Sequence, residues 1–214
     1  MRTETIVKTA YTYQELSDDA KEVARNWFKE FTAQDFEYDS VYEDAAISAK
    51  LLGIDLDKKH VPLMNGTTRP EPKIWFSGFC SQGDGACFEG SYAYAKGASK
   101  AIRSYAPQDE ELHAIADALQ ALQKPSFYRL EATCTHSGRY YHSGCMSVCV
   151  GLANCGFHDV SEDTENTLTD VLRSFADWIY SQLEAEYDYQ TSDEHAEEGI
   201  EANEYEFNED GTIY

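Results

Sequence analysis

The sequence predicts an α+β fold: an antiparallel sheet built from two hairpins plus an N-terminal strand, packed by about four to five helices. Two pairs of strand-like segments are each joined by a glycine-containing turn, which is typical of antiparallel hairpins. Several other segments carry apolar residues at helical spacing. A hydrophobic content of 42% in 214 residues is enough to form a core without disulfides or metals.

The N-terminal quarter is predicted to hold one strand and two helices. Residues 5–13 are rich in β-branched and aromatic types, as strands are. Ser17 is a good N-cap, and apolar residues recur behind it at helical spacing as far as Phe31. A second helix is expected over residues 40–52, with Gly53 as its C-terminal stop.

The middle of the chain is predicted to be a loop, a hairpin and two helices. Residues 57–72 hold three of the five prolines, which cannot donate to a strand ladder, so a loop is expected there. Residues 73–95 are predicted to form two antiparallel strands, residues 73–79 and 91–95, around a Gly-Asp-Gly turn. A short helix is expected over residues 96–105, and Asp109 caps another helix that Pro125 stops.

A second hairpin and a long helix follow. Residues 127–136 and 140–152 are expected to pair around a turn at residues 137–139. A wide apolar stripe predicts a helix over residues 162–187, and the acidic segment after it is expected to be partly helical around residues 192–203.

The domain organisation expected from these elements is simple. Residues 1–187 are predicted to form a single α+β domain, and residues 188–214 an acidic C-terminal segment that docks on the domain through aromatic anchors. No apolar leader follows Met1, and there is no run of about 18 apolar residues. We therefore expect a cytoplasmic protein without membrane contact, whose six cysteines are free thiols. The sequence leaves the oligomeric state open.

The charge balance is the most unusual property of the composition. Asp and Glu number 39 against 17 Lys and Arg, which gives a formal charge of -22. Repulsion among like charges opposes compaction, so solubility, adaptation to salt or a basic binding partner should compensate for it. Direct binding to nucleic acid or to an anionic membrane is disfavoured, because phosphates would be repelled.

The negative charge is concentrated near the C-terminus. Residues 181–214 contain 12 Asp or Glu and no Lys or Arg, and aromatic residues are interleaved with them. Carboxylates fixed on a folded frame can imitate the phosphates of a nucleic acid, whereas the alternative is a merely solubilising face. The candidate binding surface combines eight of these carboxylates with four from the preceding helix: Glu162, Asp163, Asp170, Asp177, Glu184, Glu186, Asp188, Asp193, Glu194, Glu197, Glu198 and Glu201.

A glycine-rich loop is the second candidate site. It comprises Gln82, Gly83, Asp84, Gly85 and Glu89. Backbone amides beside glycines can hold an anion, but the loop lacks the Lys-Ser/Thr of a P-loop. The alternatives are a tight turn that needs a positive φ, and a cation held by the carboxylates of Asp84 and Glu89.

Cysteine and histidine residues allow two further interpretations. One is a zinc site on the second hairpin, but its members lack the usual C-x2-C spacing: Cys134, His136, His142, Cys145 and Cys149. The other is a nucleophilic pair of Cys80 or Cys87 with His136 or His142. Buried free thiols explain the cysteines better, so no metal, no cofactor and no catalytic residue is predicted.

Three segments of this chain resemble uncharacterised acidic proteins of phages and prophages. Residues 76–90 carry the motif FSGFxSQGDGAxFEG of that family, and residues 140–142 and 202–207 are similar as well. The resemblance extends from Leu16 to the end of the chain, and some members are labelled antitoxins. It implies a role against host defences or toxins and assigns no catalytic residue.

These observations favour a phage-type, non-enzymatic inhibitor that binds a host defence or toxin protein through an acidic, nucleic-acid-mimicking surface. The expected partner is a basic or nucleic-acid-binding host protein. The alternative is a nucleotide-binding or nucleotide-degrading counter-defence protein that uses the Gly-Asp-Gly loop.

Overall fold

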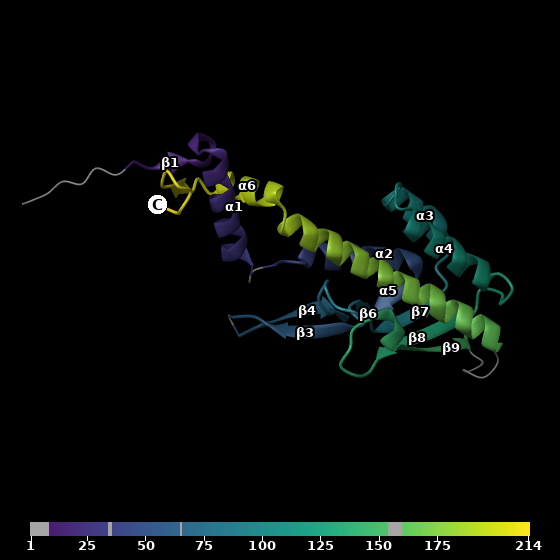
Figure 1. Ribbon diagram of the computed structural model, residues 1–214. Coiled ribbons are helices and arrows are strands. Elements are labelled where there is room, and N and C mark those ends of the chain that lie inside the picture. Colours follow the sequence, from purple (N-terminus) through teal and green to yellow (C-terminus); the bar gives the residue numbers. More distant parts are fainter. Residues whose placement is uncertain (1–8, 34–35, 65, 154–159) are drawn as a thin grey trace, which may run out of the picture. The chain divides into compact units, whose positions relative to one another are not determined.

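A computed structural model describes residues 9–33, 36–64, 66–153 and 160–214, and over these residues the protein is α+β with antiparallel sheets (Figure 1). The chain divides into two compact units, Met1–Glu37 with Ala185–Tyr214, and Tyr38–Glu184. This division differs from the single domain expected over residues 1–187, because the N-terminal helix packs with the C-terminal segment. In the described ranges, no helix combines the length and the apolar character needed to cross a membrane.

The smaller unit is built from both ends of the chain. Its elements are β1 (Tyr11–Thr12), η1 (Tyr13–Glu15), α1 (Asp18–Thr32), α6 (Asp193–Ala202) and β10 (Glu206–Phe207). The predicted cap is confirmed, since the Ser17 hydroxyl accepts from the backbone amide of Ala20. The N-terminal strand was expected in the hairpin sheet. Residues 5–8 lie outside the described ranges, and β1 pairs with β10 instead.

A separate apolar core holds this unit together. It contains Tyr13, Leu16, Ala20, Ala24, Phe28, Ala196, Ile200 and Phe207. The approach of α6 to α1 depends on Gly199, where an added Cβ would lie 2.2 Å from Cζ of Phe28. The C-terminal segment is therefore packed through its apolar residues, and its acidic residues lie around that contact.

The larger unit contains a four-stranded antiparallel sheet in the order β2-β7-β8-β9. Its strands are β2 (Ile54–Leu56), β7 (Gly90–Ala93), β8 (Leu130–His136) and β9 (Met146–Leu152). The pairing of β8 with β9 confirms the second predicted hairpin. Its connection is longer than the expected turn at residues 137–139, since it runs to the 3-10 helix η2 (Ser143–Cys145).

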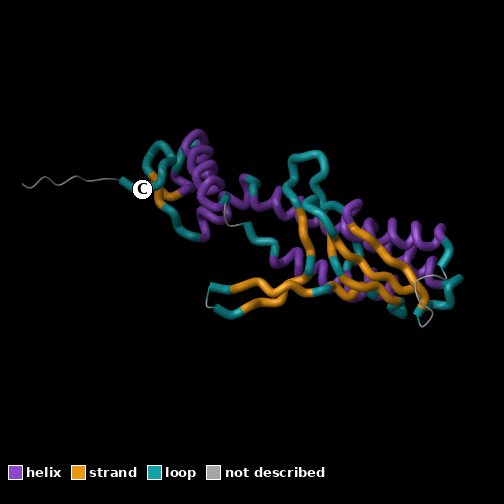
Figure 2. Tube along the Cα trace, turned by 90° about the horizontal axis from the view of Figure 1, so that it is seen from below, coloured by secondary structure: helices purple, strands orange, loops and turns teal. Residues whose placement is uncertain are grey.

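Helices cover one face of this sheet. They are α2 (Asp39–Leu52), α3 (Ala98–Tyr105), α4 (Glu110–Gln123) and α5 (Glu162–Gln190), the last of which extends beyond the unit. Figure 1 shows α2, α4 and α5 on the same side of the strands, and Figure 2 gives the view from below, with strands in orange and helices in purple. The predicted terminators are confirmed: Gly53 ends α2 with a φ of 90°, and the Asp109 side chain accepts from the amide of Leu112 at the start of α4.

The loop predicted over residues 57–72 is wrong, because this segment forms a hairpin of β3 (Lys58–Pro62) and β4 (Thr68–Pro72). The amide of Lys73 donates to the carbonyl of Asp57 at 2.7 Å, so the ladder bonds occupy odd-numbered positions. The prolines occupy even-numbered positions, whose amides would face away from the partner strand: Pro62, Pro70 and Pro72. The hairpin therefore loses no ladder bond to proline.

Two antiparallel strands flank the Gly-Asp-Gly turn, but the second one is formed by residues 86–88 and not by the expected residues 91–95. They are β5 (Ile74–Phe76) and β6 (Ala86–Phe88), which are antiparallel. The chain then leaves this pair, and β7 joins β2 and β8 in the larger sheet. Gly90 permits the change, since an added Cβ there would lie 2.3 Å from the Asp55 carbonyl oxygen.

Candidate functional site

The exposed face of α5 carries a regular row of carboxylates. Asp163, Asp170, Asp177 and Glu184 recur every seven residues, and all four are exposed. Seven residues are about 10.5 Å of helix rise, and the row turns by only about 20° per repeat. The buried residues of α5 lie on the opposite side of the helix: Leu168, Leu172, Phe175, Ala176, Ile179 and Leu183. We call the four carboxylates the α5 ridge.

No cation of α5 offsets the charge of this ridge. Arg173 is the sole Lys or Arg in the helix, and its Nη2 donates to the carbonyl oxygen of Met146 at 3.0 Å. Within the described residues, the ridge carboxylates make no hydrogen bond and no ion pair. The ridge therefore presents uncompensated negative charge on a rigid helix.

Further carboxylates from α4 lie beside the ridge. The pKa of Glu111 is raised, first by burial and then by the negative charges of Asp109 and Asp177. Asp109 is fixed in place, since its Oδ2 accepts from Nε1 of Trp178 at 2.8 Å. Three carboxylates of like charge thus lie within electrostatic range of one another, which costs free energy unless a cation relieves it.

Tyr180 connects the ridge to the glycine-rich loop. Its hydroxyl donates to the Gly78 carbonyl at 3.1 Å, and its ring stacks on Phe79 with centroids 5.5 Å apart. The pKa of Tyr180 is raised, first by burial and then by Glu184 and Asp84. The two predicted sites are therefore neighbours, although the sequence separates Glu184 and Asp84 by about 100 residues.

Within the loop, Asp84 already holds the amides that a ligand would need. Its Oδ2 accepts from the backbone amides of Cys80 at 3.0 Å and Ser81 at 2.7 Å. Gly83 has a φ of 97°, as a tight turn requires, and Gln82 is exposed. Gly85 lets the loop approach His142 closely, since a Cβ added at this position would lie 2.7 Å from Cβ of His142. The carboxylate of Asp84 thus stabilises the loop from within.

Glu89 has a structural role at a junction of strands. Its Oε2 accepts from Nζ of Lys73 at 2.8 Å, and its Oε1 accepts from the amide of His136 at 3.4 Å. The hydrogen bond from Lys73 is the main reason that the pKa of Glu89 is lowered. The carboxylates of Asp84 and Glu89 therefore bind different donors and share no common ligand.

Two acidic residues of α6 are paired with cations of α1. Asp193 lies 2.7 Å from Nζ of Lys29 and 3.6 Å from Nε of Arg25. Glu197 accepts from Nη1 of Arg25 at 2.9 Å and from the hydroxyl of Tyr13 at 2.8 Å. Two of the twelve predicted carboxylates are therefore neutralised inside the smaller unit.

Neutral donors hold three more of the predicted carboxylates. Glu201 accepts from the side-chain amide of Gln14, Glu198 from the hydroxyl of Tyr189, and Glu186 from the side-chain amide of Gln190. Three others are without a hydrogen bond or an ion pair in the ranges that the structure describes: Glu162, Asp188 and Glu194.

The thiols do not form the sites considered from sequence. His142 pairs with Cys145, its Nε2 lying 3.1 Å from Sγ, and with neither Cys80 nor Cys87. Burial raises the pKa of Cys87 and of Cys134 to about 12 in each case. No three His, Cys, Asp or Glu side chains gather as metal ligands in the described part of the chain, and the remaining cysteine, Cys155, lies outside it.

Comparison with known proteins gives one match. A family described as Domain of unknown function (DUF8835) matches residues 38–193, a range that includes both predicted hairpins and the α5 ridge. No curated protein matches the chain. No solved structure matches it either.

Proposed function

The chain belongs to the family described as Domain of unknown function (DUF8835), and we propose that it is a non-enzymatic inhibitor whose α5 ridge binds a basic, nucleic-acid-binding protein. The observation that carries this proposal is the row of four exposed carboxylates without a partner among the described residues, on a helix whose sole cation binds the carbonyl oxygen of Met146.

The spacing of the ridge suits a groove that normally binds nucleic acid. A step of about 10.5 Å along the helix is close to the rise of three base pairs, about 10 Å. Lysines and arginines that contact every third phosphate could therefore pair with successive ridge carboxylates. Such pairing also accelerates association, because opposite charges steer the encounter.

The class of target comes from the resemblance to acidic phage and prophage proteins. The resemblance implies a target among host defence or toxin proteins, and a nucleic-acid-binding protein of these classes would carry the basic groove that the ridge fits. Nucleotide binding by the Gly-Asp-Gly loop receives no comparable support, because Asp84 itself holds the amides of Cys80 and Ser81.

The test compares capture of bacterial proteins by three immobilised forms of the full chain. The first is wild type, the second is D170N/E184Q/D177N, and the third is the matched control D19N/E22Q/E30Q. The control also removes three negative charges, but from exposed positions of α1 that make no ion pair in the described part of the chain.

We expect a basic protein to be captured by wild type and by the control at low salt, and to be lost from the ridge variant. Binding should weaken by about tenfold or more between 50 and 300 mM salt, because exposed charges are screened over about 10 Å. A short DNA duplex should displace the captured protein at constant ionic strength. Capture that survives either the ridge variant or the duplex contradicts the proposal.

A further inference from the structure

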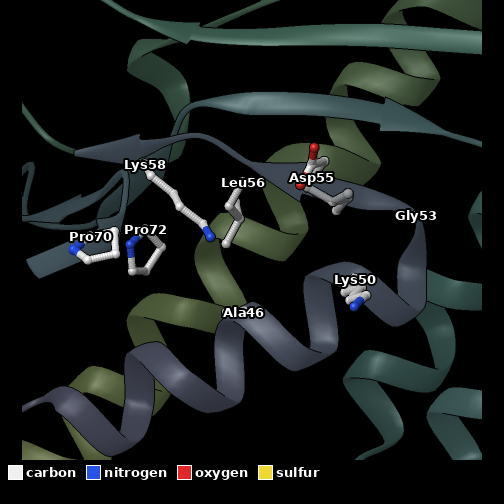
Figure 3. A pocket seen from close by; sticks show the side chains of 9 residues that line it. Ala46, Lys50, Gly53, Asp55, Leu56, Lys58, Pro70 and Pro72 are labelled. Atoms are coloured by element: carbon white, nitrogen blue, oxygen red, sulfur yellow. The ribbon is translucent and has the colours of Figure 1, made fainter. Parts of the chain in front are cut away.

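A pocket of about 520 Å³ lies between α2 and the strands β2 to β4, within the larger unit (Figure 3). Its size is in the range of small-molecule sites, about 300–1,000 Å³. The lining residues that matter most are Ala46, Lys50, Leu56, Lys58, Pro70 and Pro72. None of them belongs to the α5 ridge or to the glycine-rich loop.

Lys50 and Lys58 are the two cations of this pocket, and their ammonium groups make no hydrogen bond or ion pair to any described residue. The cations around them are all engaged. Lys59 donates to the Ile74 carbonyl at 3.3 Å, Arg69 binds Asp39 and Glu71 at 2.8 and 2.7 Å, and Lys73 binds Glu89 at 2.8 Å. Both lysines line the same pocket, and in a chain with 39 acids and 17 bases two cations without a carboxylate partner among the described residues form a local positive site that an anion can occupy.

The single carboxylate among the lining residues does not neutralise them. Side chains alternate along β2, so Ile54 and Leu56 are buried while Asp55 is exposed. Figure 3 shows the Lys58 side chain running beside Leu56 toward α2, with the Asp55 carboxylate on the other side of the strand. The face of the pocket toward α2 is therefore positive.

The remaining wall is apolar and flat. The rings of Pro70 and Pro72 lie side by side in Figure 3. The pairing of β3 with β4 holds the proline rings next to the positive charge of Lys58, because Lys58 lies directly opposite Pro72. Proline rings offer C–H groups to the face of a planar ring, so the pocket combines a stacking surface with two cations.

A smaller hollow of about 160 Å³ continues the pocket along α2. It shares Ala46, Pro70 and Pro72 with the pocket and adds the exposed carboxylate of Glu43 and the ion pair of Arg69 with Glu71. Carboxylates accept from hydroxyl and amino groups. The groove as a whole therefore offers cations at one end, a flat apolar wall, and acceptors at the other end.

We propose that this groove binds a nucleoside monophosphate. The ammonium groups of Lys50 and Lys58 bind the phosphate dianion, Pro70 and Pro72 pack against the base, and the carboxylate end accepts from hydroxyl or amino groups. The site is independent of the inhibitor function proposed for the α5 ridge, since its lining residues come from α2 and from the strands β2 to β4.

The test is titration calorimetry of the full chain with each of the four ribonucleoside monophosphates, the matching nucleosides and inorganic phosphate. At least one nucleotide should bind with a dissociation constant below about 1 mM, and about tenfold or more tighter than its nucleoside and than phosphate alone. Amide shifts of the labelled protein should change at residues 46–58 and 68–72.

The variant K50Q/K58Q should weaken nucleotide binding by about tenfold or more, because each lost charge-assisted hydrogen bond is worth about that factor. The control K100Q/K124Q removes the same charge from exposed lysines outside the groove and should stay within about twofold of wild type. Thermal melting of both variants verifies that they fold.

Three results overturn the proposal. They are the absence of binding by all four nucleotides at millimolar concentration, equal binding of nucleotide and inorganic phosphate, and an equal loss in the two lysine variants.

Discussion

Asp193 and Glu197 of α6 look like the carboxylates of the α5 ridge in sequence but have opposite surroundings. In α6, Asp193 and Glu197 are held by Lys29, Arg25 and Tyr13 at distances of 2.7 to 2.9 Å. On the ridge, the carboxylates have no partner among the described residues, and Asp177 contributes to raising the pKa of Glu111. One set of carboxylates stabilises its own unit, whereas the other remains exposed and mutually repelling.

This difference indicates which carboxylates of a strongly acidic protein are available to bind a partner. The net charge counts every carboxylate equally. A carboxylate that is paired with a cation of the same protein attracts a basic partner only weakly, because the two charges largely cancel. Unpaired like charges on a rigid helix cost stability, and a binding partner can recover that cost. The ridge is therefore the better candidate surface.

The largest effect is expected from a substitution that disturbs the packing of α1 against the C-terminal segment, where the paired carboxylates lie. Gly211 has a φ of 83°, and an added Cβ would lie 2.0 Å from the carbonyl oxygen of Ala20. We expect Gly211→Ala to lower the free energy of unfolding by about 3 kcal/mol, because a backbone clash adds to the strain of a positive φ. Urea unfolding followed by near-UV circular dichroism measures the loss.

Gly97→Ala is the matched control for that variant. Gly97 has a φ of 82°, but nothing lies within 4 Å of an added Cβ. The substitution should cost only about 1 kcal/mol, from the positive φ alone. Equal losses in the two variants would show that the C-terminal segment is not closely packed on α1.

A smaller effect separates the paired carboxylates from the unpaired ones directly. Glu197→Gln should lower the free energy of unfolding by about 1 kcal/mol, because it weakens the hydrogen bonds from Arg25 and Tyr13 at a half-exposed site. Asp177→Asn should change it by no more than about 0.5 kcal/mol, or stabilise the protein slightly, since it relieves repulsion. A clear destabilisation by Asp177→Asn would mean that the ridge is structural.

The smallest effect is a difference in the sign of the pH dependence. The pKa of Asp193 is lowered, mainly by the hydrogen bond from Lys29, so its stabilising contribution is present above the unfolded value of 3.8 and is lost as the pH falls through the folded pKa. The pKa of Glu111 is raised above 4.5, mainly by burial. Its contribution therefore changes in the opposite direction, and stability is gained as the pH falls toward 4.5.

Carbon-detected NMR titration of the carboxyl groups checks both signs. Asp177→Asn should lower the pKa of Glu111, and Lys29→Gln should raise the pKa of Asp193. The exchange of Asp18, which lies on α1, for asparagine should leave the pKa of Glu111 unchanged. If Asp177→Asn leaves that pKa where it is, the like-charge cluster beside the ridge does not exist in solution.

Local chemistry made much of the fold predictable. Ser17, Gly53 and Asp109 act at helix ends as their side chains or backbone freedom suggest, and the second predicted hairpin is observed. The hairpin of β3 and β4 was missed because proline was counted against strands as such. Whether a proline breaks a ladder depends on register, and the alternating placement of Pro70 and Pro72 was the signal in the sequence.

The sites were predictable only in part. A spacing of seven from Asp163 to Glu184 is readable from the sequence and marks one face of a helix. The positive groove was not found, because Lys50 and Lys58 belong to different elements and resemble ordinary surface lysines. The pair of His142 and Cys145 was missed because a 3-10 turn, and not an extended strand, brings the two side chains together.

The α+β class, several helix ends, the total charge and the segment of the chain in which that charge lies could all be predicted from the sequence. These properties follow from composition and from interactions between residues close in the chain. The tertiary structure alone decided which carboxylates are neutralised and which lysines lack a partner. The reason is physical: a charge is compensated by whatever group the fold brings within a few ångströms, and Arg25 lies 172 residues from Glu197 along the chain.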